Sequence, residues 1–300
     1  MMDFQGHVVA GSVVPPVRGQ AQSWDTGTGV AGYCWPAVQP RAAVLLQHGL
    51  SEYSERYVDQ YSQLIPQLQG QGYSVFAIDL EGHGRSPGPR AGTDVERSVF
   101  FHLAARRCRA KQGLPVFLFG HSLGGLVTAS SVLAEPRDVA GVILSSPALL
   151  VEAAWIRKIL ARVLARVWPD CPVGQLDPSG LSRVDEAVKC ALHDPMKSHG
   201  PLKARMAVSI LDVSEANWAR YPHWTTPVLA VHGTADRYTA VNGSRRFIAS
   251  VSATDKTLFL QEGGYHELLN DLGAVQTLAV ILNWLNERAA GVGPAGIQAS

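Results

Sequence analysis

The chain has 300 residues, of which 46% are hydrophobic and 17% are charged. So much apolar side chain excludes a disordered protein, because its burial can offset the entropy lost on ordering. The 26 Lys and Arg residues almost balance the 25 Asp and Glu residues, which leaves a net charge of +1. A dedicated nucleic-acid binder is therefore not expected, since it needs a basic excess to neutralise phosphates.

The cysteines and glycines give no sign of a metal, a nucleotide or another cofactor. Four cysteines, at positions 34, 108, 171 and 190, are widely spaced, and no Cys-x-x-Cys or His-Glu-x-x-His motif occurs. The glycine-rich segment 81–86 lacks the spacing of a dinucleotide or P-loop site. The first 14 residues do not resemble a secretory signal, and no run reaches the ~18 apolar residues of a membrane span. We therefore expect free thiols and a cytoplasmic location.

Apolar runs alternate with helical patterns along most of the chain. Runs at 42–47, 74–78, 116–119, 139–144, 227–231 and 257–260 are apolar on both parities, which is typical of strands covered on both faces. Helical patterns lie at 57–69, 95–111, 124–134, 242–250 and 273–287. The order predicts an α/β fold with a mostly parallel central sheet flanked by helices. The first forty residues are expected to add one or two antiparallel edge strands.

The interval between the strands near 146 and 227 has no clear strand pattern. It contains helical patterns at 152–168, 183–192 and 201–219. We interpret it as a helical cap over the carboxyl ends of the strands, where ligands bind in open α/β sheets. The predicted division is an α/β core at 1–146 and 226–290, a cap at 147–225, and a flexible tail at 291–300.

The pattern at 152–168 is strongly amphipathic and allows two interpretations. Its apolar positions are Ile156, Ile159, Leu160, Val163, Leu164, Val167 and Trp168, and its basic positions are Arg157, Lys158, Arg162 and Arg166. The apolar face either packs on the core or lines an acyl channel, or it rests on a membrane surface while the basic residues meet anionic headgroups.

The segment 120–125, Gly-His-Ser-Leu-Gly-Gly, lies between a predicted strand and a predicted helix. This is the Gly-x-Ser-x-Gly pattern in the context that a nucleophilic serine requires. So tight a turn needs small flanking residues and holds Ser122 at the edge of the sheet. The N–H of Leu123 then points to where an oxyanion forms. A helix-capping serine is the alternative, but the flanking strand and helix favour the nucleophile.

Two later residues are suited to activate Ser122. A serine hydroxyl needs a base, and the base needs an acid that orients it. Asp236 follows the strand at 227–231, and His266 follows the strand at 257–260. Because parallel strands end at one edge of a sheet, these side chains are expected to meet Ser122 there. No carboxylate follows the strand near 146 directly, so Glu152 is only a reserve for the acid.

The loop after the strand at 42–47 reads His48-Gly49-Leu50. Its glycine allows the backbone to turn over the nucleophile, so the N–H of Leu50 is the predicted second oxyanion donor. The alternative is an ordinary connecting loop. His48 and His232, like His121, are interpreted as oriented loop histidines rather than metal ligands.

Several segments together resemble the α/β-hydrolase superfamily, and within it the monoacylglycerol lipase and lysophospholipase-like serine hydrolases. They are residues 48–57, 79–86, 120–125, 181–183, 193–195, 232–236 and 265–266, so the resemblance spans about residues 40–285. It implies Ser122, Asp236 and His266 as the triad, and the N–H groups of Leu50 and Leu123 as the oxyanion hole. It also implies a helical cap over an acyl tunnel and no cofactor.

The chain departs from this family in the predicted cap. Similar lipases often carry a Glu and a Tyr that contact the glycerol hydroxyls, and counting from Leu-Ser-Arg at 181–183 places Ala187 and Ala191 there. Neither alanine side chain can form a hydrogen bond. Arg56 is retained, and His121 is adjacent to Ser122. These four residues form the predicted substrate pocket, with a more apolar alcohol side than in the lipases.

The sequence therefore predicts a serine hydrolase that cleaves esters with a medium or long apolar acyl chain through an acyl-enzyme on Ser122. The expected partner is a small-molecule ester or lipid, with transient contact of the cap with a membrane as a further interpretation. The alternatives are a carboxylesterase acting on non-glyceride or aromatic esters, and a peptidase or amidase. A binding protein without activity is disfavoured because such proteins usually lack a triad member.

Overall fold

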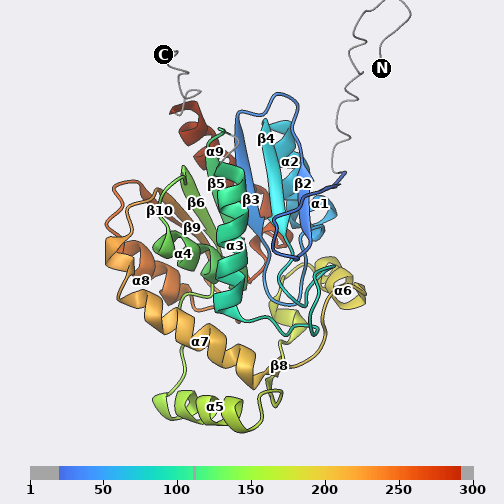
Figure 1. The fold of residues 1–300 in the computed structure, drawn as a ribbon, viewed down its shortest axis with the longest axis vertical. Helices are drawn as coiled ribbons and strands as arrows, with labels where there is room; N and C mark the ends of the chain where they lie inside the picture. The colour runs from blue at the N-terminus through green and yellow to red at the C-terminus, as the bar shows by residue number, and fades with distance from the viewer. Residues whose placement is uncertain (1–19, 111–112, 292–300) are drawn as a thin grey trace, which may run out of the picture.

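The computed structural model describes residues 20–110 and 113–291. An eight-stranded sheet with helices on both faces forms its centre (Figure 1). The strands, in spatial order, are β1 (Gln22–Ser23), β2 (Gly32–Trp35), β4 (Tyr73–Ile78), β3 (Ala42–Gln47), β5 (Val116–His121), β6 (Gly141–Ser145), β9 (Val228–Gly233) and β10 (Lys256–Gln261). The predicted tail lies outside the described residues from position 292 onward, as do the first 19 residues of the predicted core.

The sheet is parallel from β4 to β10, and β1 and β2 add an antiparallel edge. The predicted α/β class and the antiparallel edge are thus confirmed. The central strands β3, β4, β5, β6 and β9 are buried along their whole length. Because helices cover both faces, these strands are apolar on both parities instead of alternating.

The two faces of the sheet carry different helices and separate apolar clusters. One face packs against α3 (Val95–Ala110), α4 (Leu123–Ala134) and α8 (Val241–Ser250). The other packs against α1 (Arg56–Asp59), α2 (Leu64–Gly70) and α9 (Ala274–Gly291). The connecting loops at the carboxyl ends of the parallel strands remain free to carry polar side chains.

The single helix predicted at 57–69 is wrong, because the segment is broken. Between α1 and α2 a 3₁₀ turn, Tyr61–Gln63, has positive φ angles of 52°, 54° and 54°. The backbone N–H of Tyr61 donates to Asn270 Oδ1, and Ser62 Oγ donates to Leu269 O at 2.7 Å. Pro66 also lacks the N–H that a continuous helix would use at that position. The long-range hydrogen bonds of Tyr61 and Ser62 therefore stabilise the break between α1 and α2.

The insertion at residues 147–225 lies at the lower end of the sheet in Figure 1. It contains α5 (Trp155–Val167), α6 (Asp185–His193) and α7 (Ala204–Trp218), close to the predicted helices. Although the interval shows no clear strand pattern, it contains two short strands, because β7 (Pro172–Gly174) pairs antiparallel with β8 (Leu202–Lys203). Both strands are too short to show a sequence period. Among residues 20–110 and 113–291, no helix is long and apolar enough to cross a membrane.

The basic side of α5 faces α7, and its apolar side faces outward. Lys158 pairs with Glu215 at 2.9 Å, and Arg162 pairs with Asp212 and Glu215, each at 2.7 Å. No residue of α5 is buried. Most of its apolar residues are exposed, namely Trp155, Ile156, Ile159, Leu160, Val163 and Val167, with the following Trp168, whereas Leu164 is half-buried. The interpretations that this apolar face packs on the core or lines an acyl channel are therefore both wrong, since ion pairs with α7 orient the helix the other way and no residue of α5 lines the cavity at Ser122.

Candidate active site

Ser122 lies at the sharp turn between β5 and α4. Its φ of 55° and ψ of −118° are strained for a residue with a side chain. A Cβ on Gly120 would lie 2.5 Å from Thr128 Oγ1, and one on Gly124 would overlap the backbone oxygen of Gln47. The glycines of the motif are thus required for the turn to approach β3 and α4 closely.

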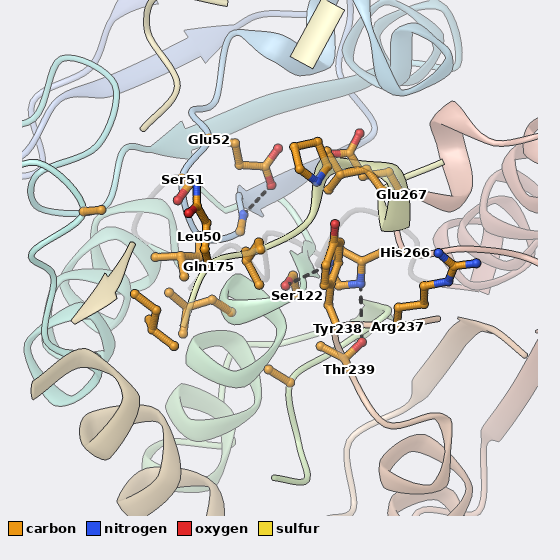
Figure 2. A pocket seen from close by; sticks show the side chains of 18 of the residues that line it. Leu50, Ser51, Glu52, Ser122, Gln175, Arg237, Tyr238, Thr239, His266 and Glu267 are labelled. Carbon is orange, nitrogen blue, oxygen red and sulfur yellow. Dashed lines mark hydrogen bonds between the residues drawn. The ribbon is translucent and has the colours of Figure 1, made fainter. Parts of the chain in front are cut away.

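The structure brings Ser122, His266 and Asp236 together in one hydrogen-bonded chain. His266 Nδ1 lies 2.8 Å from Asp236 Oδ2, and His266 Nε2 lies 2.9 Å from Ser122 Oγ. Because the carboxylate can only accept, Nδ1 carries the proton and Ser122 Oγ donates to Nε2. Figure 2 shows the His266 ring between Ser122 and Thr239. This is the geometry in which a histidine removes a serine proton.

Asp236 is held as a carboxylate. Thr239 Oγ1 donates to its Oδ2 at 2.7 Å, and the N–H groups of Tyr238 and Thr239 donate to its Oδ1 at 2.8 Å and 3.1 Å. Burial alone would raise the pKa of Asp236, but His266 and the hydrogen bonds from His232 and His266 hold that pKa well below its usual value. Asp236 therefore stays charged beside the imidazole.

The interaction with Asp236 also changes the pKa of His266. Burial lowers the pKa of His266, but the charge and hydrogen bond of Asp236 more than offset this, so the pKa of His266 is raised above its ordinary 6.5. A raised pKa makes the imidazole a stronger base and stabilises the imidazolium formed when it takes the serine proton.

Two backbone N–H groups lie close to Ser122 without a partner. The loop after β3 approaches so closely that a Cβ on Gly49 would lie 3.0 Å from Ser122 Cβ. Leu50 and Leu123 both line the cavity next to Ser122. Within the described chain, neither of their N–H groups has a hydrogen-bond acceptor. Such free amides can bind an oxyanion.

A cavity of about 590 Å³ opens at Ser122 and His266. Its apolar wall comes from the insertion at residues 147–225, including α7, and includes Leu150, Leu176, Leu181, Leu202 and Ile210. Its polar wall includes Glu52, His121, Lys197 and Glu267. The size is that of small-molecule sites, and the division into an apolar and a polar part suits an amphipathic ligand.

Only some of the predicted pocket residues line the cavity. His121 and Ala191 line the cavity, and Ala191 is buried on α6. Ala187, one turn earlier on α6, is half-buried and does not line it. Arg56 does not line it either, because its side chain is fully buried behind the polar wall. Glu152 lines the cavity but bonds Asn242, so the acid at His266 is Asp236.

Arg56 joins the two carboxylates of the polar wall. Its Nη1 lies 3.0 Å from Glu52 Oε2 and 3.5 Å from Glu267 Oε1. Tyr57 and Tyr61 donate to Glu52 at 3.1 Å and 2.7 Å. Burial would raise the pKa of both carboxyls, but the charge of Arg56, joined at Glu267 by that of Lys197, holds both pKa values below their usual range. The sequence analysis missed Glu52, Lys197 and Glu267, and only the spacing of Glu52 and Arg56 (i, i+4) hinted at this pairing.

No group of three or more His, Cys, Asp or Glu side chains that could hold a metal occurs in the described residues. The arrangement instead offers a serine, a base, a buried carboxylate and two free amides at one cavity. Together, these groups can perform acyl transfer.

The strand order, the serine turn and the insertion before β9 define an α/β-hydrolase. The Hydrolase_4 family, described as "Serine aminopeptidase, S33", matches residues 38–273. Human monoglyceride lipase is 34% identical over 272 residues, which cover 88% of each chain. Monoacylglycerol lipase of Mycolicibacterium smegmatis is 31% identical over 83% of this chain and 90% of that one.

A crystal structure of Paleococcus ferrophilus monoacylglycerol lipase superposes with a TM-score of 0.78 and 34% identity, covering 86% of this chain and 99% of that one. The chain belongs to this hydrolase family, as the resemblance in the sequence indicated.

Proposed function

We propose that the chain hydrolyses monoacylglycerols and related esters with a medium or long apolar acyl chain, through an acyl-enzyme on Ser122. Carboxylic ester hydrolysis itself follows from membership of a family that includes monoglyceride lipases. The observation that carries the mechanism is the hydrogen-bonded chain from Ser122 through His266 to Asp236. The amphipathic cavity beside it supports the proposed substrate.

In the proposed mechanism, His266 takes the proton from Ser122 Oγ as that oxygen attacks the ester carbonyl. The N–H groups of Leu50 and Leu123 bind the oxyanion of the tetrahedral intermediate, and Asp236 stabilises the imidazolium. Collapse of the intermediate releases the alcohol, which leaves with the proton from His266. Water then attacks the acyl-enzyme in the same way and releases the acid. Loss of one oxyanion donor typically costs about 10²–10³ in turnover.

The acyl chain is assigned to the apolar wall, and the insertion at residues 147–225 acts as the cap. The leucines of this wall all lie in the insertion, which therefore forms the proposed acyl tunnel. An amidase would need the same triad, and the family description itself names a peptidase. The apolar wall favours an acyl ester over a peptide.

The test uses a serine-reactive alkyl phosphonate and a pair of decanoyl substrates. We expect stoichiometric labelling of the wild type, no labelling of Ser122→Ala, and release of decanoate from 1-decanoylglycerol. Ser146→Ala is the matched control, because Ser146 is a buried serine on the neighbouring strand end. If the Ser122→Ala variant is still labelled, Ser122 is not the nucleophile. Faster cleavage of decanoyl amides than of esters would favour the amidase.

We also propose that the exposed apolar face of α5 contacts a lipid surface. Trp155 and Val167, at the two ends of α5, are 71% and 75% exposed. An indole at each end, at Trp155 and Trp168, suits the membrane interface. Flotation with phosphatidylcholine vesicles should recover the wild type but not a Trp155→Ser, Leu160→Ser double variant. The control is Val275→Ser, which alters a valine on α9 that is 84% exposed. Equal flotation of all three proteins would refute the contact.

A further inference from the structure

A turn after α6 holds Lys197 in the polar wall of the cavity. The N–H of Lys197 donates to Asp194 O at 3.2 Å, and the N–H of Ser198 donates to Ser51 O at 3.2 Å. Ser51 follows Leu50 in the loop beside Ser122. Hydrogen bonds at Lys197 and at the next residue therefore hold the backbone of this turn. They fix the position of the Lys197 Cα relative to the loop beside Ser122.

The ammonium of Lys197 is nearly buried and lacks a close partner. Its side chain is 9% exposed, and Nζ lies 3.9 Å from Glu267 Oε1, which is too long for a hydrogen bond. Glu267 has other partners, Asn270 at 2.6 Å and Arg56 at 3.5 Å. Across the described ranges, no acceptor lies within hydrogen-bond distance of Nζ. Burial accordingly lowers the pKa of Lys197.

An ammonium has three donors, and buried donors without acceptors are unfavourable. A ligand oxygen in the cavity can satisfy them. The neighbouring His121 offers the complementary group, because its Nδ1 donates to Ser145 O at 3.1 Å and its Nε2 is left as an acceptor. Burial lowers the pKa of His121 to about 4, so the ring stays neutral at physiological pH.

These groups line the same cavity as Ser122 and His266. His266 returns its proton to the leaving oxygen, so the alcohol lies on the side of the serine that faces this ring. The ring centres of His121 and His266 are 4.9 Å apart, and Glu267 directly follows His266. In Figure 2, Glu52 and Glu267 lie on one side of Ser122 and His266, and Thr239 lies on the other.

We propose that Lys197 determines alcohol specificity by donating hydrogen bonds to a hydroxyl group of the leaving alcohol, while His121 and Glu267 accept from its hydroxyl groups. This inference rests on the proposed ester hydrolysis and names the alcohol side of the same site. It provides the hydroxyl recognition that Ala187 and Ala191 cannot supply.

The charges nearby select a neutral alcohol. In and directly behind this wall, the carboxylates of Glu52, Asp194 and Glu267 outnumber the cations of Arg56 and Lys197. An anionic alcohol therefore meets a net negative surface, whereas a neutral polyol gains donors and acceptors without repulsion. The predicted substrates are esters of small polyhydroxylated alcohols.

The experiment compares kcat/KM for 1-decanoylglycerol and ethyl decanoate, which share one acyl chain. The wild type should favour the glyceride at least tenfold. Lys197→Met should reduce this preference at least tenfold, with little change for the ethyl ester, and Lys197→Arg should retain most of it. Lys189→Met is the control, because Lys189 is an exposed lysine on α6 whose side chain is 65% exposed.

The outcomes separate this inference from the function on which it rests. Equal losses on both esters in Lys197→Met would indicate a structural role and overturn the inference. If the wild type does not favour the glyceride over the ethyl ester, the inference is overturned, even where Lys197→Met fails to fold. Faster cleavage of the decanoyl ester of glycolate, whose alcohol is anionic, would also overturn it. If the wild type cleaves neither decanoyl ester, the proposed function itself fails.

Discussion

Asp236→Asn tests how the carboxylate controls His266. Oδ1 of Asp236 accepts two backbone N–H groups, from Tyr238 and Thr239, whereas Oδ2 faces His266 Nδ1. In the variant, the amide oxygen must stay at the Oδ1 position, because the reverse orientation would place an NH₂ group against both backbone donors, which cannot turn away. The Thr239 hydroxyl, which donates to Oδ2 in the wild type, can turn to Ser146 O at 3.0 Å instead. That reversal would cost about 2–4 kcal/mol in lost hydrogen bonds. The NH₂ group therefore faces His266.

A donor at that position forces His266 Nδ1 to accept, which moves the ring proton to Nε2. His266 Nε2, which lies 2.9 Å from Ser122 Oγ in the wild type, then donates its N–H to that oxygen and cannot remove the serine proton. The wrong tautomer lowers kcat about 10⁴-fold in serine hydrolases with this triad. This loss corresponds to about 5 kcal/mol of transition-state stabilisation.

The assay is kcat for ethyl decanoate in wild type, Asp236→Asn and the control Asp212→Asn. Asp212 is a half-exposed carboxylate on α7, so its neutralisation should leave kcat unchanged. Because the fold around Asp236 keeps its backbone hydrogen bonds, the melting temperature of Asp236→Asn should stay within a few degrees of wild type. A variant that is folded and retains kcat within about tenfold would refute the tautomer argument.

Two further predictions concern buried charges. Because Asp236 raises the pKa of His266 above 6.5, and the neutral ring is the active form, kcat/KM should fall with decreasing pH along a limb centred above pH 6.5. A limb centred at or below that value would contradict the shift. Arg56→Met leaves Glu52 and Glu267 without their guanidinium and should cost about 3–5 kcal/mol. Calorimetry of Arg56→Met should then show a melting temperature lower than that of the wild type by ~10 °C. The control is Arg157→Met, at an exposed site, and equal melting temperatures of the two variants would contradict this prediction.

The fold class and the arrangement of the triad candidates could be predicted because their signals are local or follow chain order. The motif around Ser122 carries its own geometry in two glycines. Asp236 and His266 follow strands that end at the same edge, so no knowledge of distant contacts was needed. The strands of the sheet could also be predicted from the sequence, because strands covered on both faces are apolar throughout.

Long-range contacts decided what the sequence did not reveal. The break at Tyr61 depends on Asn270 and Leu269, more than 200 residues later. The orientation of α5 depends on the acidic side of α7, which offers its basic residues ion pairs. A hydrophobic period alone locates the apolar face of a helix but does not indicate what covers it.

The alcohol side of the cavity shows the same limit at the scale of single residues. Ala187 and Ala191 are one turn apart, so helical spacing predicts that both face the ligand, yet only Ala191 lines the cavity. Lys197 lies beyond the end of α6 in a turn, where no helical period applies. The turn depends on a hydrogen bond to Ser51, almost 150 residues earlier, which places the ammonium beside Glu267. Specificity at this wall therefore depends on which loops meet there, and the motif residues alone do not determine it.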